Sequence, residues 1–380
     1  KSAEIPVPEL ILPTGISFYT FAALSYCLDV WGDKIKAERN PFDYMLFVAF
    51  FPTLLSGPIE RAGHLISQIK EKHDFDADRI KNGFLLMLWG YFLKMVLSDR
   101  IAVIVDKVFG EYRSYTGLFS LTAILLYSLQ IYFDFASYSC IALGTGEILG
   151  FKLISNFERP YFATSVADFW RRWHISLTSF FRDYIYIPLG GNRKGRIRKY
   201  VNILVVFALS GLWHGASWKF VFWGVLNGIF QVAGDILKPL RMKISSFTGA
   251  REDSFGRRMY RTVFTYILAS AAWTFFRADS FRIGMEMLRN CFYYNPWVLF
   301  DGSFTTLGID GADICIIACS LFVVLFVSIL NERRIIVREV VERQELWFRW
   351  IFYIAAVLTV LVFGMYGPMY DPSDFIYFRF

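Results

Sequence analysis

FWRRWHISLTSFFRDYIYIPLGGNRKGRIRKYVNILVVFALSGLWHGASWKFVFWG, the stretch from Phe169 to Gly224, carries the features around which the rest of the chain is organised. It contains His174 and His214, two of the four histidines, and a tryptophan precedes each of them. A Pro-Leu-Gly-Gly turn and a dense basic run lie between the two. The segments on either side have the apolar length of membrane-spanning helices. Ionisable side chains at membrane depth are costly, so both histidines are functional candidates.

The composition of the 380-residue chain indicates a multi-pass helical membrane protein surrounded by lipid. Hydrophobic residues make up 55% of it and aromatic residues 19%, and the mean hydropathy is +0.40. The net charge of +7 fits Lys and Arg gathered in short cytoplasmic loops, which resist translocation. Because no RNA-binding or basic amphipathic motif accompanies that charge, we expect no nucleic-acid partner. The five cysteines form no metal-binding pattern.

Apolar segments predict one membrane domain over residues 1–380, with roughly eight to ten helices or half-helices. Leu10–Trp31 is interrupted by Pro13 and Gly15, and a broken helix of this kind requires burial by protein. Phe42–Leu55 is short enough to be re-entrant. Because the chain begins just before an apolar segment, we expect further spans to precede it in the native protein. The other predicted spans and part-spans are Gly83–Val105, Gly117–Phe135, Ile141–Ile154, Val201–Leu212, Trp218–Leu237, Thr262–Phe276, Ala312–Leu330 and Trp350–Met365.

His214 is the strongest candidate for chemistry. The apolar segment before it, Val201–Leu212, is only about two-thirds of a span and ends at a Ser-Gly pair. Small residues on both sides leave room beside the imidazole for a substrate. A neutral imidazole can take the proton from an attacking hydroxyl and return it to a leaving group. The sequence therefore predicts that His214 is catalytic; the alternative is a buried histidine hydrogen-bonded between helices.

For two further residues, a functional and a structural role are equally compatible with the sequence. His174 follows FWRRW, whose aromatic and basic character suits an interfacial structural role as well as a catalytic one. Asp134, in YFDFASYS between two predicted spans, is an intramembrane carboxylate and thus a functional candidate. It is also compatible with a structural salt bridge, for instance to Arg171 or Arg172.

The sequence also gives expectations for the other two histidines and for metal binding. His64 and His73 lie in a polar segment and are expected to be solvated. A metal site built on His174 and His214 lacks a third ligand at a recognisable spacing, so we expect no bound metal.

The basic run directly follows the turn that ends at Asn192. It comprises Arg193, Lys194, Arg196, Arg198 and Lys199. It is the strongest positive-inside signal in the chain. A cytoplasmic basic loop is also where an anionic donor would arrive, such as a coenzyme A phosphate or an acidic carrier protein. No phosphate-cradling glycine loop, serine-nucleophile elbow or catalytic cysteine pattern is present.

The chain resembles the membrane-bound O-acyltransferase (MBOAT) family, in the branch of the bacterial alginate and polysaccharide O-acetyltransferases. The matching segments are LPTGISFYTFAALSYCLDV, FPTLLSGPIER, YSLQIYFDFASYSCIALG, NFERPYFATSVADFWRRWHISLTSFFRDYIYIPLGGNRKG, LSGLWHGASWKFVFWG and the tail ending in FIYFRF. They cover the chain in family order, and the paired WRRWHISL and GLWHG motifs are the most specific.

The resemblance implies an all-α polytopic fold with re-entrant segments around a central tunnel, in the inner (cytoplasmic) membrane of a bacterium. It makes His214 the match to the family's catalytic histidine and His174 the match to its supporting histidine. Asp134, Trp213 and Asn192 are further supporting candidates.

The resemblance also implies an O-acyltransferase with no bound cofactor and with acetyl-CoA as donor substrate. We expect the acetyl group to pass from a cytoplasmic thioester to hydroxyls of an extracytoplasmic exopolysaccharide or peptidoglycan, through an extracytoplasmic partner acetyltransferase. His214 would act as general base, and His174, with Asp134, would position the thioester or stabilise developing charge. The basic residues Arg193, Lys194 and Arg196 would face the donor.

Two alternatives remain open at this point. D-alanyl transfer to teichoic acid from an acyl carrier protein shares both histidine motifs, although the intact PLGGNRKG favours the polysaccharide branch. A proton-coupled transporter or flippase would use the histidines for proton coupling. It should show similarly interrupted helices in two halves, and the sequence has no such repeat.

Overall fold

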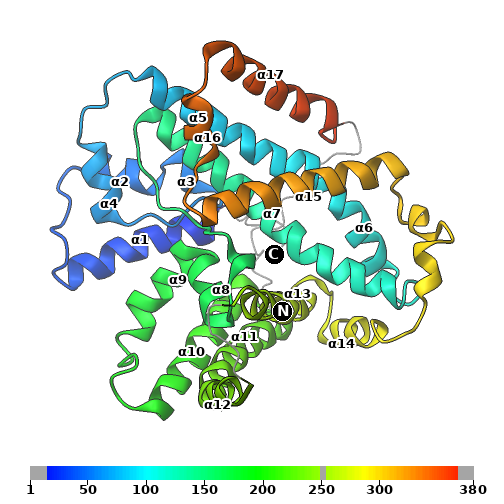
Figure 1. The fold of residues 1–380 in the computed structure, drawn as a ribbon. Helices are drawn as coiled ribbons and strands as arrows, with labels where there is room; N and C mark the ends of the chain where they lie inside the picture. The colour runs from blue at the N-terminus through cyan, green and yellow to red at the C-terminus, as the bar shows by residue number, and fades with distance from the viewer. Residues whose placement is uncertain (1–14, 249–253, 367–380) are drawn as a thin grey trace, which may run out of the picture.

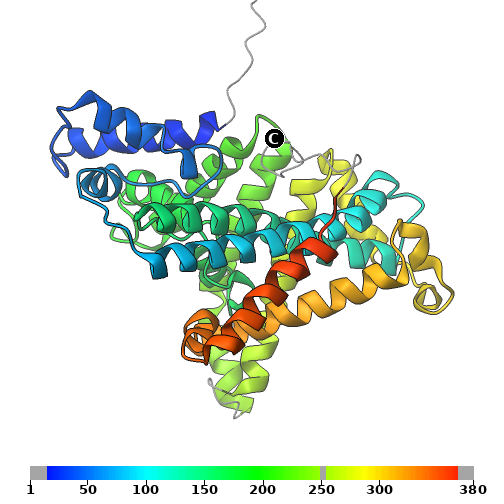
Figure 2. The same ribbon diagram turned by 90° about the horizontal axis from the view of Figure 1, so that it is seen from above.

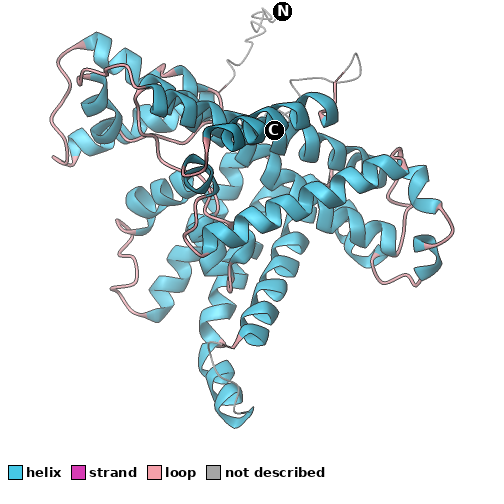
Figure 3. Cartoon of the chain, turned by 45° about the horizontal axis from the view of Figure 1, so that its top comes forward, coloured by secondary structure: helices cyan, strands magenta, loops and turns pink. Residues whose placement is uncertain are grey.

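The regular structure of this chain is helical. The structure, a computed structural model, describes residues 15–248 and 254–366, and those residues form helices joined by turns and loops, with no strand among them (Figures 1 and 3). The predicted all-α class is confirmed. Pro13 and the tail motif FIYFRF lie outside the described residues.

The helices follow one another with short connections. In chain order they are α1 (Ile16–Trp31), α2 (Pro41–Val48), α3 (Phe51–Leu54), α4 (Ala62–Ile69), α5 (Ala77–Tyr91), η1 (Phe92–Ser98), α6 (Asp99–Gly110), α7 (Leu118–Leu149), η2 (Pro160–Phe162), α8 (Val166–Arg172), α9 (Ile175–Phe181), η3 (Arg182–Tyr186), α10 (Arg196–His214), α11 (Trp218–Ile236), α12 (Lys238–Thr248), α13 (Phe255–Arg277), α14 (Phe281–Asn290), η4 (Pro296–Leu299), η5 (Ser303–Leu307), α15 (Gly311–Glu332), α16 (Val337–Glu342) and α17 (Leu346–Phe363). By length and composition, α7, α15 and α17 can each cross a membrane, and α11 with α12 forms a fourth candidate bent by 47°.

The centre of the fold is α7, a single helix of 32 residues, with α5 packed along it (Figures 1 and 2). The sequence predicted two spans here, broken at YFDFASYS, and that prediction was wrong. The polar side chains of this segment are accommodated inside the helix, since the Ser137 hydroxyl donates to the Asp134 carbonyl of the preceding turn. At about 48 Å, α7 is longer than a bilayer core of about 30 Å.

The predicted span Gly83–Val105 is part of a longer helical run formed by α5, η1 and α6. Its middle section, η1, is π-helical. A π-helical segment widens the turn and changes the direction of the side chains that follow, and such segments often occur at functional sites. Here Lys94 of η1 points at α7 and pairs with Asp134.

The first helices form a separate layer (blue in Figure 1). The backbone of Gly15 adopts a left-handed conformation with φ of 82°, and α1 begins at the next residue. Phe42–Leu55 forms two short helices, α2 and α3, rather than one continuous helix. Ala22, Phe47 and Leu65 bury the faces of α1, α2 and α4 against one another.

The predicted part-span Val201–Leu212 is longer in the structure. The helix α10 begins at Arg196 and ends at His214, a total of 19 residues, because part of the basic run forms its first turns. The other predicted spans lie in the helices α11, α13, α15 and α17, with shifted ends. Of these four helices, α15 and α17 are each long and apolar enough to cross a membrane on their own.

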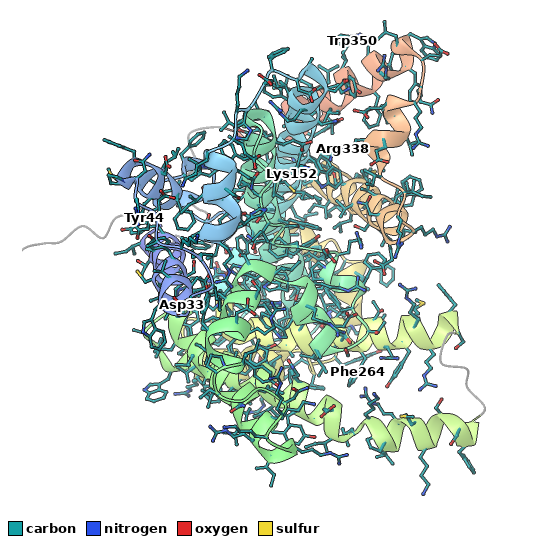
Figure 4. All side chains as sticks on the ribbon, turned by 90° about the vertical axis from the view of Figure 1, so that its left-hand side faces the viewer. Asp33, Tyr44, Lys152, Phe264, Arg338 and Trp350 are labelled. Atoms are coloured by element: carbon teal, nitrogen blue, oxygen red, sulfur yellow. The ribbon has the colours of Figure 1, made fainter. Side chains whose placement is uncertain are left out.

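One face of the molecule collects the basic ends of several helices. The start of α10 meets the end of α11 through Lys199 and Asp235, 2.8 Å apart, and the start of α13 meets the end of α15 through Arg258 and Glu332, 2.9 Å apart. The helices α12 and α13 project side by side from this region (Figure 4). We call this surface the basic face; it comprises Arg193, Lys194, Arg196, Arg198, Lys199, Lys238, Arg241, Lys243, Arg257, Arg258, Arg261, Arg333 and Arg334.

Helices α10 and α11 pack closely because glycines line their contact. A Cβ atom on Gly224 would lie 2.1 Å from the Phe207 carbonyl oxygen, and one on Gly211 would lie 2.2 Å from the Phe220 carbonyl oxygen. Both glycines therefore allow the backbones to approach, as small residues do between membrane helices.

We expect Gly224→Ala to lower the free energy of unfolding by about 1–3 kcal/mol, because the methyl group would force α10 and α11 apart. Thermal unfolding in detergent measures the loss. Gly234→Ala is the matched control, since that glycine is on the same helix and its Cβ would meet nothing within 4 Å. Equal stability of the two variants would contradict the close-packing argument.

Candidate active site

His214 is the last residue of α10 and lies inside an aromatic enclosure. Its side chain is buried, with 8% of the residue exposed. The imidazole centroid lies 4.7 Å from the ring of Trp213, 5.2 Å from Trp223 of α11 and 5.3 Å from Phe276 of α13. Three helices thus surround the ring with apolar aromatic surface.

His174 lies between α8 and α9 in a strained backbone conformation. Its φ of 44° and ψ of 54° are left-handed, which costs about 1–2 kcal/mol for a non-glycine residue. The residue is 1% exposed, and its ring centroid lies 4.7 Å from that of Phe135 of α7 and 6.3 Å from that of Phe18 of α1. Strain of this kind persists only where the surroundings fix the backbone, and it clusters at functional sites.

Asn156 fixes the backbone at His174. The Asn156 carbonyl accepts the backbone N–H of Ile175, at 2.9 Å. The fully buried side chain donates from Nδ2 to Ser139 Oγ of α7, at 3.1 Å, and accepts from Ser176 Oγ of α9, at 2.6 Å. This network ties the turn that carries His174 to the central helix. Sequence reasoning missed it; the available signal was a polar residue opening the matching segment NFERPYF.

The structure brings His174, His214 and Trp213 together. The Trp213 ring lies 4.7 Å from the His214 ring and 6.3 Å from the His174 ring. Residues from α1, α7, the turn between α8 and α9, α10, α11 and α13 therefore converge on one buried site.

Asp134 is salt-bridged, with a partner different from the one predicted. Lys94 Nζ lies 2.7 Å from Asp134 Oδ1 and 2.9 Å from Asp99 Oδ1. Arg171 and Arg172 do not provide this charge, since both pair with Asp168. Because α7 continues through Asp134, the carboxylate faces η1.

Asn192 and the basic run lie away from His214. Asn192, Arg193 and Lys194 are exposed in the turn before α10, and Arg196 is the first residue of the helix rather than part of a loop. Arg196 and His214 are the first and last residues of the 19-residue helix α10, which places them about 27 Å apart along its axis. The predicted donor-facing residues and the predicted catalytic histidine therefore stand at opposite ends of α10.

The other two histidines are outside the site. The exposed His64 lies with Nδ1 2.8 Å from a Glu60 carboxylate oxygen, and this hydrogen bond raises the pKa of His64. His73 was predicted to be solvated, but it is half-buried against Phe151, with ring centroids 4.5 Å apart. Among residues 15–248 and 254–366, no group of three or more His, Cys, Asp or Glu is arranged to hold a metal ion.

Asn156→Ala is expected to destabilise the protein by about 1–3 kcal/mol, because it leaves buried hydroxyls on two helices without their partner. Asn227→Ala is the matched control: Asn227 is also buried, but its amide donates to the Trp223 carbonyl of its own helix. Thermal unfolding of both variants in detergent gives the comparison. Similar losses would show that the Asn156 network does not hold α7 and α9 together.

The described residues thus define a helical membrane protein that encloses two histidines in an aromatic site. The family model of MBOAT, the membrane-bound O-acyltransferase family, matches residues 15–274, which include both histidines, and the chain belongs to this family.

The chain is similar to proteins named for the acylation of three different polymers. A protein of Azotobacter vinelandii named "Probable alginate O-acetylase AlgI" is 38% identical over 295 residues, covering 78% of this chain and 56% of the relative. The "Peptidoglycan O-acetyltransferase" of Helicobacter pylori is 34% identical over 308 residues, covering 74% of this chain and 57% of the relative. The "Teichoic acid D-alanyltransferase" of Bacillus subtilis is 27% identical over 257 residues, covering 63% of this chain and 62% of the relative. The chain therefore spans somewhat more than half the length of these relatives.

Proposed function

We propose that this chain is an O-acyltransferase that moves an acetyl group from a thioester donor to a hydroxyl of an extracytoplasmic polysaccharide. The observation that carries the proposal is the buried pair of His174 and His214, joined through Trp213, inside the segment that matches the family. The relatives named for alginate and peptidoglycan acetylation are more similar to the chain than those named for teichoic acid D-alanylation. This difference supports acetyl transfer over D-alanyl transfer.

The proposed orientation puts the basic face in the cytoplasm of a bacterial cell, in the inner membrane. Positively charged segments are retained on the cytoplasmic side, and this face holds the start of α10, the projecting helices α12 and α13, and the end of α15. Acetyl-CoA, or an acyl carrier protein in the alternative function, would approach there, facing Arg193, Lys194 and Arg196. His214, at the other end of α10, would lie on the acceptor side, where an extracytoplasmic partner acetyltransferase would receive the acetyl group.

The proposed chemistry requires only a base and a means to stabilise charge, with no bound cofactor. Neutral His214 accepts the proton of the acceptor hydroxyl as its oxygen attacks the thioester carbonyl. When the tetrahedral intermediate collapses, the C–S bond breaks and the protonated imidazole returns the proton to the leaving thiolate. His174 stabilises the developing oxyanion. The aromatic enclosure limits water near the thioester and so opposes its hydrolysis. Trp213 holds the two histidines in register, and Asp134 supports them only indirectly, through α7.

The proposal is tested by supplying the purified full chain with two donors in turn. With labelled acetyl-CoA, an acceptor polysaccharide and the extracytoplasmic proteins of the source cell, we expect free thiol to appear together with label on polysaccharide hydroxyls. Turnover with a D-alanyl carrier protein and none with acetyl-CoA would assign the teichoic acid function instead. A transporter would release no thiol with either donor, and that result would overturn both proposals.

A further inference from the structure

An open hollow on the basic face is built mainly from arginines. It has a volume of about 410 Å³. Its lining consists of Glu158, Arg159, Asp168, Arg171, Arg172, Glu332 and Arg334. These residues come from the segment after α7, from α8 and from the end of α15, so the hollow lies where three parts of the chain meet.

Four guanidinium groups line this hollow, against three carboxylates, those of Glu158, Asp168 and Glu332. Glu332 alone is shared by three guanidinium groups, those of Arg159 at 2.9 Å, Arg172 at 3.2 Å and Arg258 at 2.9 Å. Arg334 forms no side-chain hydrogen bond or ion pair with any residue in 15–248 or 254–366.

The Asp168 carboxylate is likewise shared by two guanidinium groups. Both Arg171, at 3.3 Å, and Arg172, at 3.4 Å, lie against one of its oxygens. Each guanidinium group carries five N–H donors, and most of those in the hollow are not used by its carboxylates. An anion bound there would gain both charge and hydrogen bonds.

The backbone around the hollow is also strained. Only four non-glycine residues in the described ranges have positive φ, and two of them, Arg159 at 49° and Arg334 at 62°, line the hollow. A third is His174. Arg334 directly follows the C-cap residue of α15, where a left-handed residue commonly terminates a helix, and Arg159 directly precedes η2. Both arginines line the hollow from these turns.

The hollow lies close to His174 along the chain. Arg172, which lines the hollow, and His174 are separated by one residue, so their Cα atoms lie within about 7 Å of each other. A ligand whose anionic end occupies the hollow would therefore lie near the turn that carries His174.

We infer that this hollow binds the phosphate groups of a pantetheine thioester such as acetyl-CoA, with the pantetheine arm directed towards His174. The identity of the ligand rests on the proposed function. Arginine forks match phosphate oxygens in paired hydrogen bonds, and phosphates are the anionic part of such a donor. The phosphate of a phospholipid headgroup shares this chemistry, and the experiment separates the two sources.

The test measures equilibrium binding of coenzyme A to the full chain in nanodiscs of zwitterionic phosphatidylcholine. In the double variant Arg171→Gln/Arg334→Gln, we expect binding to weaken at least about tenfold, since two charge-assisted contacts are lost. These two arginines are chosen because neither pairs with Glu332. Arg282→Gln on α14 is the matched control, an exposed arginine paired with Glu286, and should bind within about twofold of the unsubstituted chain.

Pantetheine without phosphate provides the second arm, and the double variant should bind it as the unsubstituted chain does. Unchanged coenzyme A binding in the double variant would overturn the inference, as would an equal loss for pantetheine. Phosphatidylglycerol added to the nanodiscs provides the third arm. If it displaces coenzyme A from the unsubstituted chain, and the double variant no longer retains this lipid, the hollow is a lipid site and the inference is wrong.

Binding of coenzyme A is measured without acetyl transfer, so this test does not depend on the proposed reaction. His214→Gln should bind coenzyme A as the unsubstituted chain does. Coenzyme A bound in the hollow by a protein that transfers no acetyl group would support the inference and contradict the proposed function. Acetyl transfer that does not depend on Arg171 and Arg334 would support the proposed function and contradict the inference.

Discussion

His214→Gln is expected to lower kcat for thioester-dependent acyl transfer by about 10²–10⁴-fold, the usual contribution of a general base. Glutamine keeps much of the size and polarity of the imidazole but cannot accept the proton of the attacking hydroxyl. The side chains that enclose His214, those of Trp213, Trp223 and Phe276, offer no base in its place. Release of free thiol and label on the acceptor are the two measurements.

The control for this substitution is His64→Gln, which removes a histidine outside the site. It should leave both readouts unchanged. Thermal unfolding of both variants separates loss of chemistry from loss of fold. If His214→Gln turned over at the unsubstituted rate while remaining folded, His214 would be a structural histidine.

Lys94→Met should lower the free energy of unfolding by about 3–5 kcal/mol, the cost of breaking a buried ion pair from one side. Lys94 lies between Asp134, at 2.7 Å, and Asp99, at 2.9 Å, and Asp134 is 1% exposed. Without the ammonium group, two carboxylates would face each other in an apolar environment. The contact between η1 and α7 depends on this lysine.

Lys107→Met is the matched control for Lys94→Met. The side chains of Lys107 and its partner Glu111 are 40% and 49% exposed. Lys107 belongs to α6, the continuation of the same helical run, and Glu111 directly follows that helix. An exposed pair contributes about 0–1 kcal/mol. Chemical or thermal unfolding in detergent gives the difference between the two variants, and equal losses would mean that the Lys94 pairs do not stabilise the helix contact.

The positions of helices were predicted most accurately from the sequence where hydrophobic residues form long, uninterrupted segments. The helices α11, α13, α15 and α17 were predicted because long apolar runs of this kind have few other structures available in a membrane. Small polar residues misled the prediction for α7. The serines around Asp134 resemble a break, but Ser137 bonds back to the preceding turn inside the helix, and Ser139 accepts a hydrogen bond from Asn156. Similarly, the basic residues before Val201 resemble a loop and yet begin α10.

The candidate site was predicted in part. The Trp-His pairs marked His174 and His214, and the structure places them close together. The partner of Asp134 was not predictable, because Lys94 is 40 residues away in sequence and points at α7 only through the π-helical turn. Asn156 was missed because its role depends on a left-handed backbone at His174, and nothing local in the sequence reveals that conformation. Long-range pairing and backbone strain are properties of the assembled fold.

The most direct test of the central claim, that His214 transfers acyl groups across the membrane, uses proteoliposomes of determined orientation. Labelled acetyl-CoA is supplied on the side of the basic face, and an acceptor polysaccharide with the extracytoplasmic proteins of the source cell on the other side. We predict label on acceptor hydroxyls in step with thiol release, and neither with His214→Gln. Label that reaches the acceptor equally well with His214→Gln, or only when donor and acceptor share one side, would contradict the account.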